Sequence, residues 1–288
     1  MLTQLVRRVC LLLLVIVLGG CSAQFGYRFA DTYVEWQLAK YVDLSGSLED
    51  NVDRSIDELH QWHAQTQLPR YRDLLVELIE GIDTDTLTVK QVVGLSEQAY
   101  GFWTTIRNQL EPYALTYLPQ LTPEQRQQLL ENLRERLQEE REDYQERDPE
   151  DAKKERLDKL FDRAKEWLGP LQKEQRTLLR RWLEQRGSSR EQWLAYQQRW
   201  LELFAATLNN PEAADYAEQM SLLITQPEQL RSDELNRMVA ANTLLTQQLS
   251  VDIYSTLTNG QKQHLRNKLE GYRKTLDSLI ENFATSPQ

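Results

Sequence analysis

Apolar residues recur every three or four positions along most of the chain, and this spacing predicts α-helices. The clearest stripe lies near residues 48–62, with steps of four, four, three and three: Leu48, Val52, Ile56, Leu59 and Trp62. No stretch bounded by turn residues alternates between apolar and polar positions, so we expect no sheet. Glycine and proline are sparse, at 11 and 9 residues. The sequence therefore predicts an all-α fold, a multi-helix antiparallel bundle of about eight to ten helices.

Three helix starts share the pattern Leu-x-x-x-Gln, at residues 121–125, 171–175 and 257–261, and Leu44-Ser45 is a degenerate relative. In the first, Thr122 can cap the helix, proline at the next position lacks only an unneeded N–H, and Gln125 can close a capping box. The intervals of 50 and 86 residues are not a fixed period. The pattern therefore predicts turns but is weak evidence for duplication.

Other residues predict where the helices begin, bend or end. Thr88 and Gln91 predict another capping box, Pro69 predicts a bend or restart, and Pro112 predicts a break. From residue 139 to residue 159, sixteen of twenty-one residues are charged, with mixed signs. We expect this run to form a solvated, protruding helical hairpin that turns at Asp148-Pro149, because oppositely charged residues four apart support exposed helices.

The N-terminus carries a targeting pattern. Arg7 and Arg8 precede an apolar run over residues 9–18, which is short for a bilayer core of about 30 Å, and Leu18-Gly19-Gly20-Cys21 follows. These residues resemble the lipobox of bacterial lipoproteins. The resemblance implies a signal peptide at 1–20, lipidation of Cys21, and a short linker over 21–25. An uncleaved membrane helix and an ordinary signal peptide are the alternatives.

The position after the lipidated cysteine is serine, whereas lipoproteins retained in the inner membrane resemble each other in carrying aspartate there. The resemblance thus implies an outer-membrane protein that faces the periplasm and contacts the membrane through its lipid. The remaining helical domain spans 26–284, with two sub-bundles that could meet near 146–170.

Composition narrows the chemistry. The formal net charge is −10, and loss of Arg7 and Arg8 with the signal lowers it to −12, which argues against nucleic-acid partners. The two cysteines are Cys10, inside the signal, and Cys21. Thiol catalysis and cysteine-bound zinc are therefore excluded from the mature domain.

Aromatic and histidine residues offer candidate sites. The aromatics of residues 26–42, among them Tyr33 and Trp36, are typical of a first core helix, or alternatively of a belt touching the bilayer. Asp57, His60 and His63 are spaced to share a helix face that could hold a metal, but no third and fourth ligand is apparent, so we interpret the histidines as surface or interface residues. We predict no metal, no cofactor and no catalytic residue.

Two family resemblances emerge from these motifs. The Leu-Thr-x-x-Gln turns are similar to those of Spy-type periplasmic chaperones, although this chain is longer and acidic. A second resemblance runs over nearly the whole chain and involves the lipobox, Gly26-Tyr27 to Asp43-Leu44, Trp62-His63 to Arg70-Tyr71, and 193–199. These segments look like an uncharacterised family of Gram-negative lipoproteins. That resemblance implies architecture and placement only.

Three hypotheses about the function follow from the sequence. We expect a non-enzymatic envelope lipoprotein that binds a protein partner as a chaperone-like or scaffolding factor. The alternative is a helical module that binds lipid or glycan in a groove lined by aromatics such as Trp103, Trp182, Trp193 and Trp200. A metal-dependent envelope enzyme is the third, but acidic pairs such as Glu139-Glu140 are typical of solvated helix faces and no catalytic motif is present.

Overall fold

The computed structural model describes residues 26–285, and these residues form helices without any strand. The all-α prediction is confirmed. The elements are α3 (Ala30–Ala39), α4 (Gly46–Asp83), α5 (Val89–Tyr117), η1 (Leu118–Gln120), α6 (Pro123–Glu146), α7 (Pro149–Leu168), α8 (Lys173–Gln185), α9 (Arg190–Leu208), α10 (Tyr216–Thr225), η2 (Pro227–Leu230), α11 (Asp233–Ser255) and α12 (Asn259–Thr285). Signal, lipobox and Cys21 lie outside the described residues.

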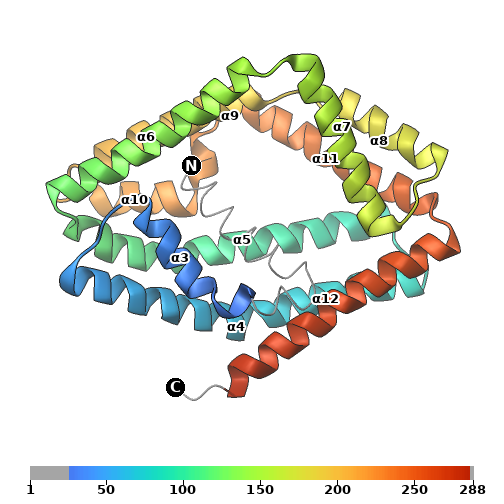
Figure 1. Cartoon of the computed structure of the whole chain (residues 1–288), viewed down its shortest axis with the longest axis horizontal. Coiled ribbons are helices and arrows are strands. Elements are labelled where there is room, and N and C mark those ends of the chain that lie inside the picture. Colours follow the sequence, from blue (N-terminus) through green and yellow to red (C-terminus); the bar gives the residue numbers. More distant parts are fainter. Residues whose placement is uncertain (1–25, 286–288) are drawn as a thin grey trace.

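The helices are arranged as an angular frame (Figure 1). Helices α4, α5 and α12 run along one side, α6 and α9 pair along another, and α8 and α11 pair along a third. Helix α7 descends from the α6 corner to α12, and α3 crosses in front of α4. The frame is closed because the C-terminal helix returns to pack against α4, far away in sequence.

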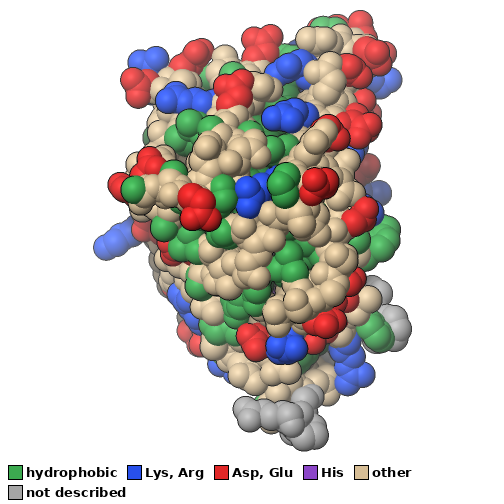
Figure 2. Space-filling view, turned by 90° about the vertical axis from the view of Figure 1, so that its left-hand side faces the viewer, with side chains coloured by type: hydrophobic (Ala, Val, Ile, Leu, Met, Phe, Trp, Pro, Cys, Tyr) green, Lys and Arg blue, Asp and Glu red, His purple; other side chains and the backbone are tan. Residues whose placement is uncertain are grey.

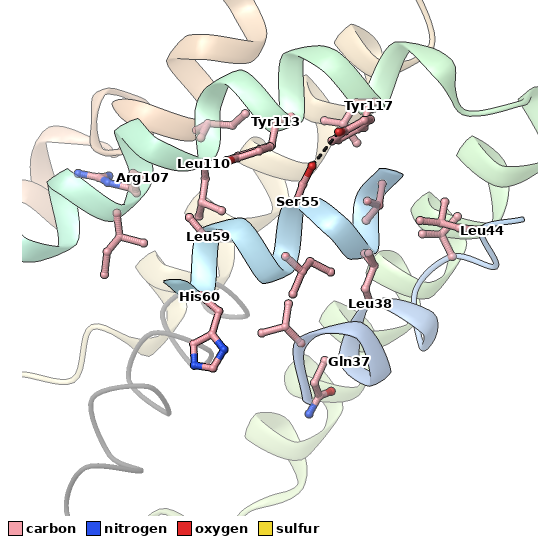
Figure 3. Close-up of a pocket in the computed structure, with 18 of the residues that line it drawn as sticks. Gln37, Leu38, Leu44, Ser55, Leu59, His60, Arg107, Leu110, Tyr113 and Tyr117 are labelled. Atoms are coloured by element: carbon pink, nitrogen blue, oxygen red, sulfur yellow. Dashed lines mark hydrogen bonds between the residues drawn. The ribbon is translucent and has the colours of Figure 1, made fainter. Parts of the chain in front are cut away.

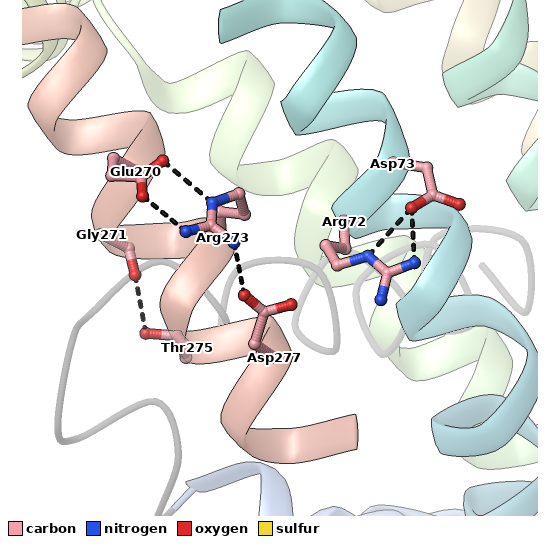
Figure 4. A network of polar contacts seen from close by, with 7 residues as sticks. All are labelled: Arg72, Asp73, Glu270, Gly271, Arg273, Thr275 and Asp277. Atoms are coloured by element: carbon pink, nitrogen blue, oxygen red, sulfur yellow. Dashed lines mark hydrogen bonds and ion pairs between the residues drawn. The ribbon is translucent and has the colours of Figure 1, made fainter. Parts of the chain in front are cut away.

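Apolar contacts join α12 to α4. Leu276 and Leu279 are buried against Leu68 and Tyr71. Several charged residues pair within one helix: Arg273 contacts Glu270 and Asp277 on α12, and Arg72 contacts Asp73 on α4 (Figure 4). One exposed ion pair, between Arg266 and Asp83, joins the two helices. Because exposed ion pairs add little stability, the apolar contacts hold this side of the frame together.

The four predicted turns meet two by two. Gln125 closes its capping box and donates from Nε2 to the carbonyl of Asp43, beside the degenerate turn at Leu44. Gln175 and Gln261 close the other two boxes and bind each other, each Nε2 donating to the other Oε1 at 2.9 Å. Glutamines thus fasten two corners of the frame. We call the second one the glutamine corner, defined by Gln175 and Gln261.

The charged segment turns where the sequence predicts. Asp148 caps α7 through the amides of residues 150 and 151, and Pro149 is the first residue of the helix. Most side chains of α7 are exposed. Its far end packs against α8 and α12 rather than back along α6, with Trp167 against Tyr272 and Lys268 paired with Glu166. The charged run therefore bridges two sides of the frame, and the prediction of a protruding hairpin is wrong.

The predicted break at Pro112 and a restart at Pro69 are wrong, because α4 continues through Pro69 and α5 through Pro112. A bend at Pro69 stays a prediction. Leu68 and Tyr71 beside Pro69 are buried. Packing of these neighbours offsets the lost backbone hydrogen bond, so tertiary contacts override the local preference.

Candidate functional site

An apolar cavity of about 330 Å³ lies between α3, α4 and α5 and reaches α6, α9 and α10. Its floor is the predicted apolar stripe of α4, from Leu48 to Trp62. The four aliphatic residues of this stripe are only half-buried. The fourteen helical steps from Leu48 to Trp62 rise about 21 Å, so the cavity is elongated along α4. We call it the α4 cavity.

The rest of the lining is also mainly apolar. Helix α3 contributes Val34 and Leu38, α5 contributes Trp103 and Leu110, and α9 contributes Trp200. A protein interior rarely leaves voids larger than a water molecule, whose share of liquid volume is about 30 Å³. A space of this size is therefore a feature of the fold rather than a packing defect.

The polar groups on the wall are few, and several bind each other. Ser55 and Tyr117 share a hydrogen bond of 2.7 Å between their hydroxyls (Figure 3). Gln37 donates to the Tyr33 hydroxyl. These groups have partners, so the middle of the cavity offers mostly carbon surface.

The end of the cavity near residues 59–63 carries two buried histidines. His63 contacts the Tyr27 hydroxyl through Nδ1 at 2.7 Å and the Tyr71 hydroxyl through Nε2 at 3.1 Å. Burial lowers the pKa of His63 to about 3, with a smaller contribution from His60. His63 is therefore a neutral structural group, and burial likewise raises the pKa of Tyr27 well above its usual value.

His60 is arranged differently. Its Nδ1 lies 3.1 Å from Oδ2 of Asp31 on α3, and its ring contacts Tyr27 and Phe283 edge-on. The side chain is 7% exposed, yet Nε2 has no hydrogen-bond partner among the described residues. Asp31 and His60 both line the α4 cavity.

Arg107 on α5 is the second such group on the wall. Its Nη1 and Nη2 donate to the Glu228 carboxylate at 2.7 and 3.4 Å, whereas its buried Nε has no partner within the described part of the chain. The guanidinium helps to hold the pKa of Glu228 below its usual value, against the effect of burial. His60 and Arg107 are thus buried polar groups that each have one atom without a hydrogen-bond partner in the described part of the chain.

The interpretation of His60 and His63 as surface residues is wrong, because both are buried. The residue that joins His60 is Asp31, 29 positions away, whereas Asp57 is exposed. Within residues 26–285 no group of three or more His, Cys, Asp or Glu side chains could hold a metal ion. No sequence signal links Asp31 with His60, since they meet only when α3 crosses α4.

The other candidate residues are dispersed. Of the four groove tryptophans, Trp103 and Trp200 line the α4 cavity, while Trp193 packs on the main core and Trp182 lies beside Arg186. Glu140 is buried and pairs with Arg190, and Glu139 is exposed and pairs with Arg136.

The interpretation of the aromatic N-terminal segment as a core helix holds only in part and is wrong for Trp36, and contact with a bilayer stays a prediction. Tyr27 is fully buried, whereas Phe29 and Trp36 are 51% and 56% exposed. No helix within residues 26–285 is both long and apolar enough to cross a bilayer.

Comparison with known proteins gives one match. A model described as "Family of unknown function (DUF6279)" matches residues 40–236, a range that holds α4 to α10 and leaves out α3, α12 and most of α11. No curated protein and no solved structure matches the chain. The match agrees with the resemblance to an uncharacterised family and covers more than half of the sequence. The chain therefore belongs to the family of unknown function DUF6279.

Proposed function

We propose that this protein is an envelope lipoprotein, tethered through Cys21 to the periplasmic face of the outer membrane, that binds the hydrocarbon chain of a lipid in the α4 cavity. The observation that carries the proposal is the apolar stripe of α4, which faces an elongated cavity instead of a sealed core. Pockets of roughly 300–1,000 Å³ with mostly apolar walls are typical of small-molecule sites.

The shape and lining favour a lipid chain over other ligands. The cavity runs about 21 Å along the helix, whereas one leaflet of a bilayer core is about 15 Å thick. A hydrocarbon chain would cover the half-buried aliphatic side chains, and each Å² of apolar surface removed from water contributes about 25 cal/mol. A glycan would instead need many hydrogen bonds, and the wall offers few free polar groups.

The surface gives less support to a protein partner, the function that we expected from the sequence. The large exposed hydrophobic residues are spread over several helices: Phe29, Trp36, Val89, Tyr100, Leu203 and Leu244. Figure 2 shows the end of the molecule where α4 begins, with hydrophobic side chains gathered in its lower middle and charged ones at its edges. Single exposed hydrophobic residues are common on soluble proteins. A chaperone-like or scaffolding role is therefore the second choice.

The test uses the purified full chain and N-phenyl-1-naphthylamine, a neutral fluorophore that brightens in apolar sites. We expect saturable binding of the probe. Val52→Trp would fill the cavity and weaken binding at least about tenfold, because the added ring occupies the space of the ligand. Val89→Trp, at an exposed position of α5, is the matched control and should bind as the wild type does.

Thermal unfolding separates cavity filling from misfolding. Because Val52 borders empty space, Val52→Trp should fold cooperatively with little loss of stability. The proposal is overturned if the wild type does not bind the probe, or if a folded Val52→Trp variant binds it equally well.

A further inference from the structure

Two polar atoms on the cavity wall are unsatisfied, and they belong to residues that lie apart. Figure 3 shows His60 and Arg107 on the side of Leu59 with their side chains directed away from each other, whereas Leu38 and Leu44 lie toward the other end. Both unpartnered atoms, His60 Nε2 and Arg107 Nε, belong to side chains more than nine-tenths buried. A buried donor or acceptor left without a partner destabilises a protein, so such atoms call for an explanation.

The chemistry of His60 Nε2 selects a head group. Asp31 accepts from Nδ1–H of His60, which places the lone pair of the neutral ring on Nε2. A carboxylic acid can give its proton to that nitrogen and accept it back as a hydrogen bond, so the pair stays neutral overall. Arg107 is directed elsewhere and is held by Glu228, so this pairing does not use it.

The neighbours of His60 are compatible with this head group. They are Asp31 from α3, Tyr27, His63 from α4, and Phe283 from α12. Tyr27 and His63 are engaged with each other, and Phe283 is apolar. Asp31 is thus the one carboxylate in this set, and it lies on the Nδ1 side, away from the free nitrogen.

We propose that the α4 cavity binds a long-chain carboxylic acid, with its carboxyl group at His60 and its chain extended along α4 toward Leu44. The inference rests on the proposed function and adds the class and the direction of the ligand. A phospholipid or lipid ester would also fill the apolar part, but it has no acidic carboxyl to exchange a proton with His60.

The first experiment compares three ligands of equal chain length. Palmitic acid, methyl palmitate and 1-hexadecanol displace the neutral probe from the full chain, and the wild type should bind the acid at least about tenfold more tightly than the ester. In His60→Phe we expect the preference for the acid to vanish while the affinities for the probe and the ester persist. His264→Phe, at an exposed histidine, should behave as the wild type.

The second experiment needs no variant. The chain has three histidines, so ¹⁵N-labelled histidine gives few NMR signals. Palmitic acid should shift the Nε2 resonance of His60, methyl palmitate should shift it less, and His264 should not respond. This readout decides the matter if His60→Phe does not fold.

The outcomes separate the two proposals. If acid and ester bind equally, or if the His60 resonance ignores the acid, the carboxylic-acid inference is wrong while chain binding stands. If no ligand displaces the probe and the probe itself does not bind, the proposed function fails as well.

Discussion

The glutamine corner and the α4 cavity both place polar side chains in the interior, but they treat them differently. At the corner, Gln175 Nε2 donates to Thr256 and to Gln261, and Gln261 Nε2 donates to Pro170 and to Gln175. Both Oε1 atoms also accept a backbone amide, from Gln172 and Thr258. Every polar atom of the two amides therefore has a partner.

At the end of the cavity, by contrast, not every buried polar atom has a hydrogen-bond partner. Nε2 of His60 and Nε of Arg107 are buried and unpartnered, and both belong to residues that border empty apolar space. Satisfied buried amides fix the geometry of a fold, whereas unpartnered polar atoms beside an apolar cavity are typical of a ligand site. The difference indicates that the corner holds the frame together and that the cavity end is available to a ligand.

His63 lines the same cavity wall, but both of its ring nitrogens have hydrogen-bond partners. We expect its effect on the pH dependence of stability to be the largest of the effects predicted here. Its pKa is about 3 in the folded chain and about 6.5 when unfolded. As the pH falls through this window the unfolded chain takes up the proton and the folded chain does not. Stability should therefore fall, by up to roughly 1.4 kcal/mol per pH unit from this group, and the loss should end near pH 3.

The measurement compares urea unfolding of the wild type and His63→Phe between pH 7 and pH 3.5. At pH 7 the variant should be less stable by about 2 kcal/mol, because the Tyr27 hydroxyl loses its buried partner. Since only the wild type carries the titrating ring, the gap should close near about pH 5, and below that pH the variant should be the more stable of the two. Parallel pH profiles would contradict the structural role that we give to His63.

Gln175→Leu should break the glutamine corner. The substitution keeps the volume but removes the cap on the Gln172 amide and two donors, so we expect a loss of about 3 kcal/mol in urea unfolding. Gln263→Leu is the matched control, because Gln263 is exposed on α12 and bonds only to Asn267. It should change stability by less than about 0.5 kcal/mol.

A double variant sharpens this test. Once Gln175→Leu is present, Gln261→Leu should add less than it costs alone, because the two amides share their bonds. Additive losses would mean that the pair is not coupled, and the corner would then differ less from the cavity than the structure indicates.

Local sequence patterns predict many of the helices and turns of the frame. The apolar spacing predicts the helices, and the capping boxes at Thr88 and Thr122 lie where the residues Gln91 and Gln125 indicate. These features depend on residues three or four apart, which the sequence displays directly. The prolines within α4 and α5 do not end these helices. Packing against parts of the chain that are distant in sequence decides whether a helix continues through a proline.

The α4 cavity could not be predicted from local sequence patterns. The stripe of α4 is visible in the sequence, but a stripe facing a core and a stripe facing a cavity have the same spacing. The pairing of His60 with Asp31 and of Arg107 with Glu228 depends on separations of 29 and 121 residues. Which buried nitrogen lacks a partner is a property of the folded neighbourhood alone.

Among the variants at buried polar residues, His60→Phe should change the free energy of unfolding least. A small change is what distinguishes the end of the cavity from the glutamine corner. Phenylalanine keeps the ring contacts with Tyr27 and Phe283 and removes an unpartnered buried nitrogen, whose presence costs about 1–3 kcal/mol. The lost contact with Asp31 offsets part of this gain, but the Asp31 side chain is 26% exposed and stays hydrated. Without ligand, unfolding in urea should therefore differ from wild type by less than about 1 kcal/mol. With palmitic acid present, the wild type should gain stability through binding to the folded state, and the variant should gain less. A large loss without ligand would show that His60, like Gln175, serves the fold.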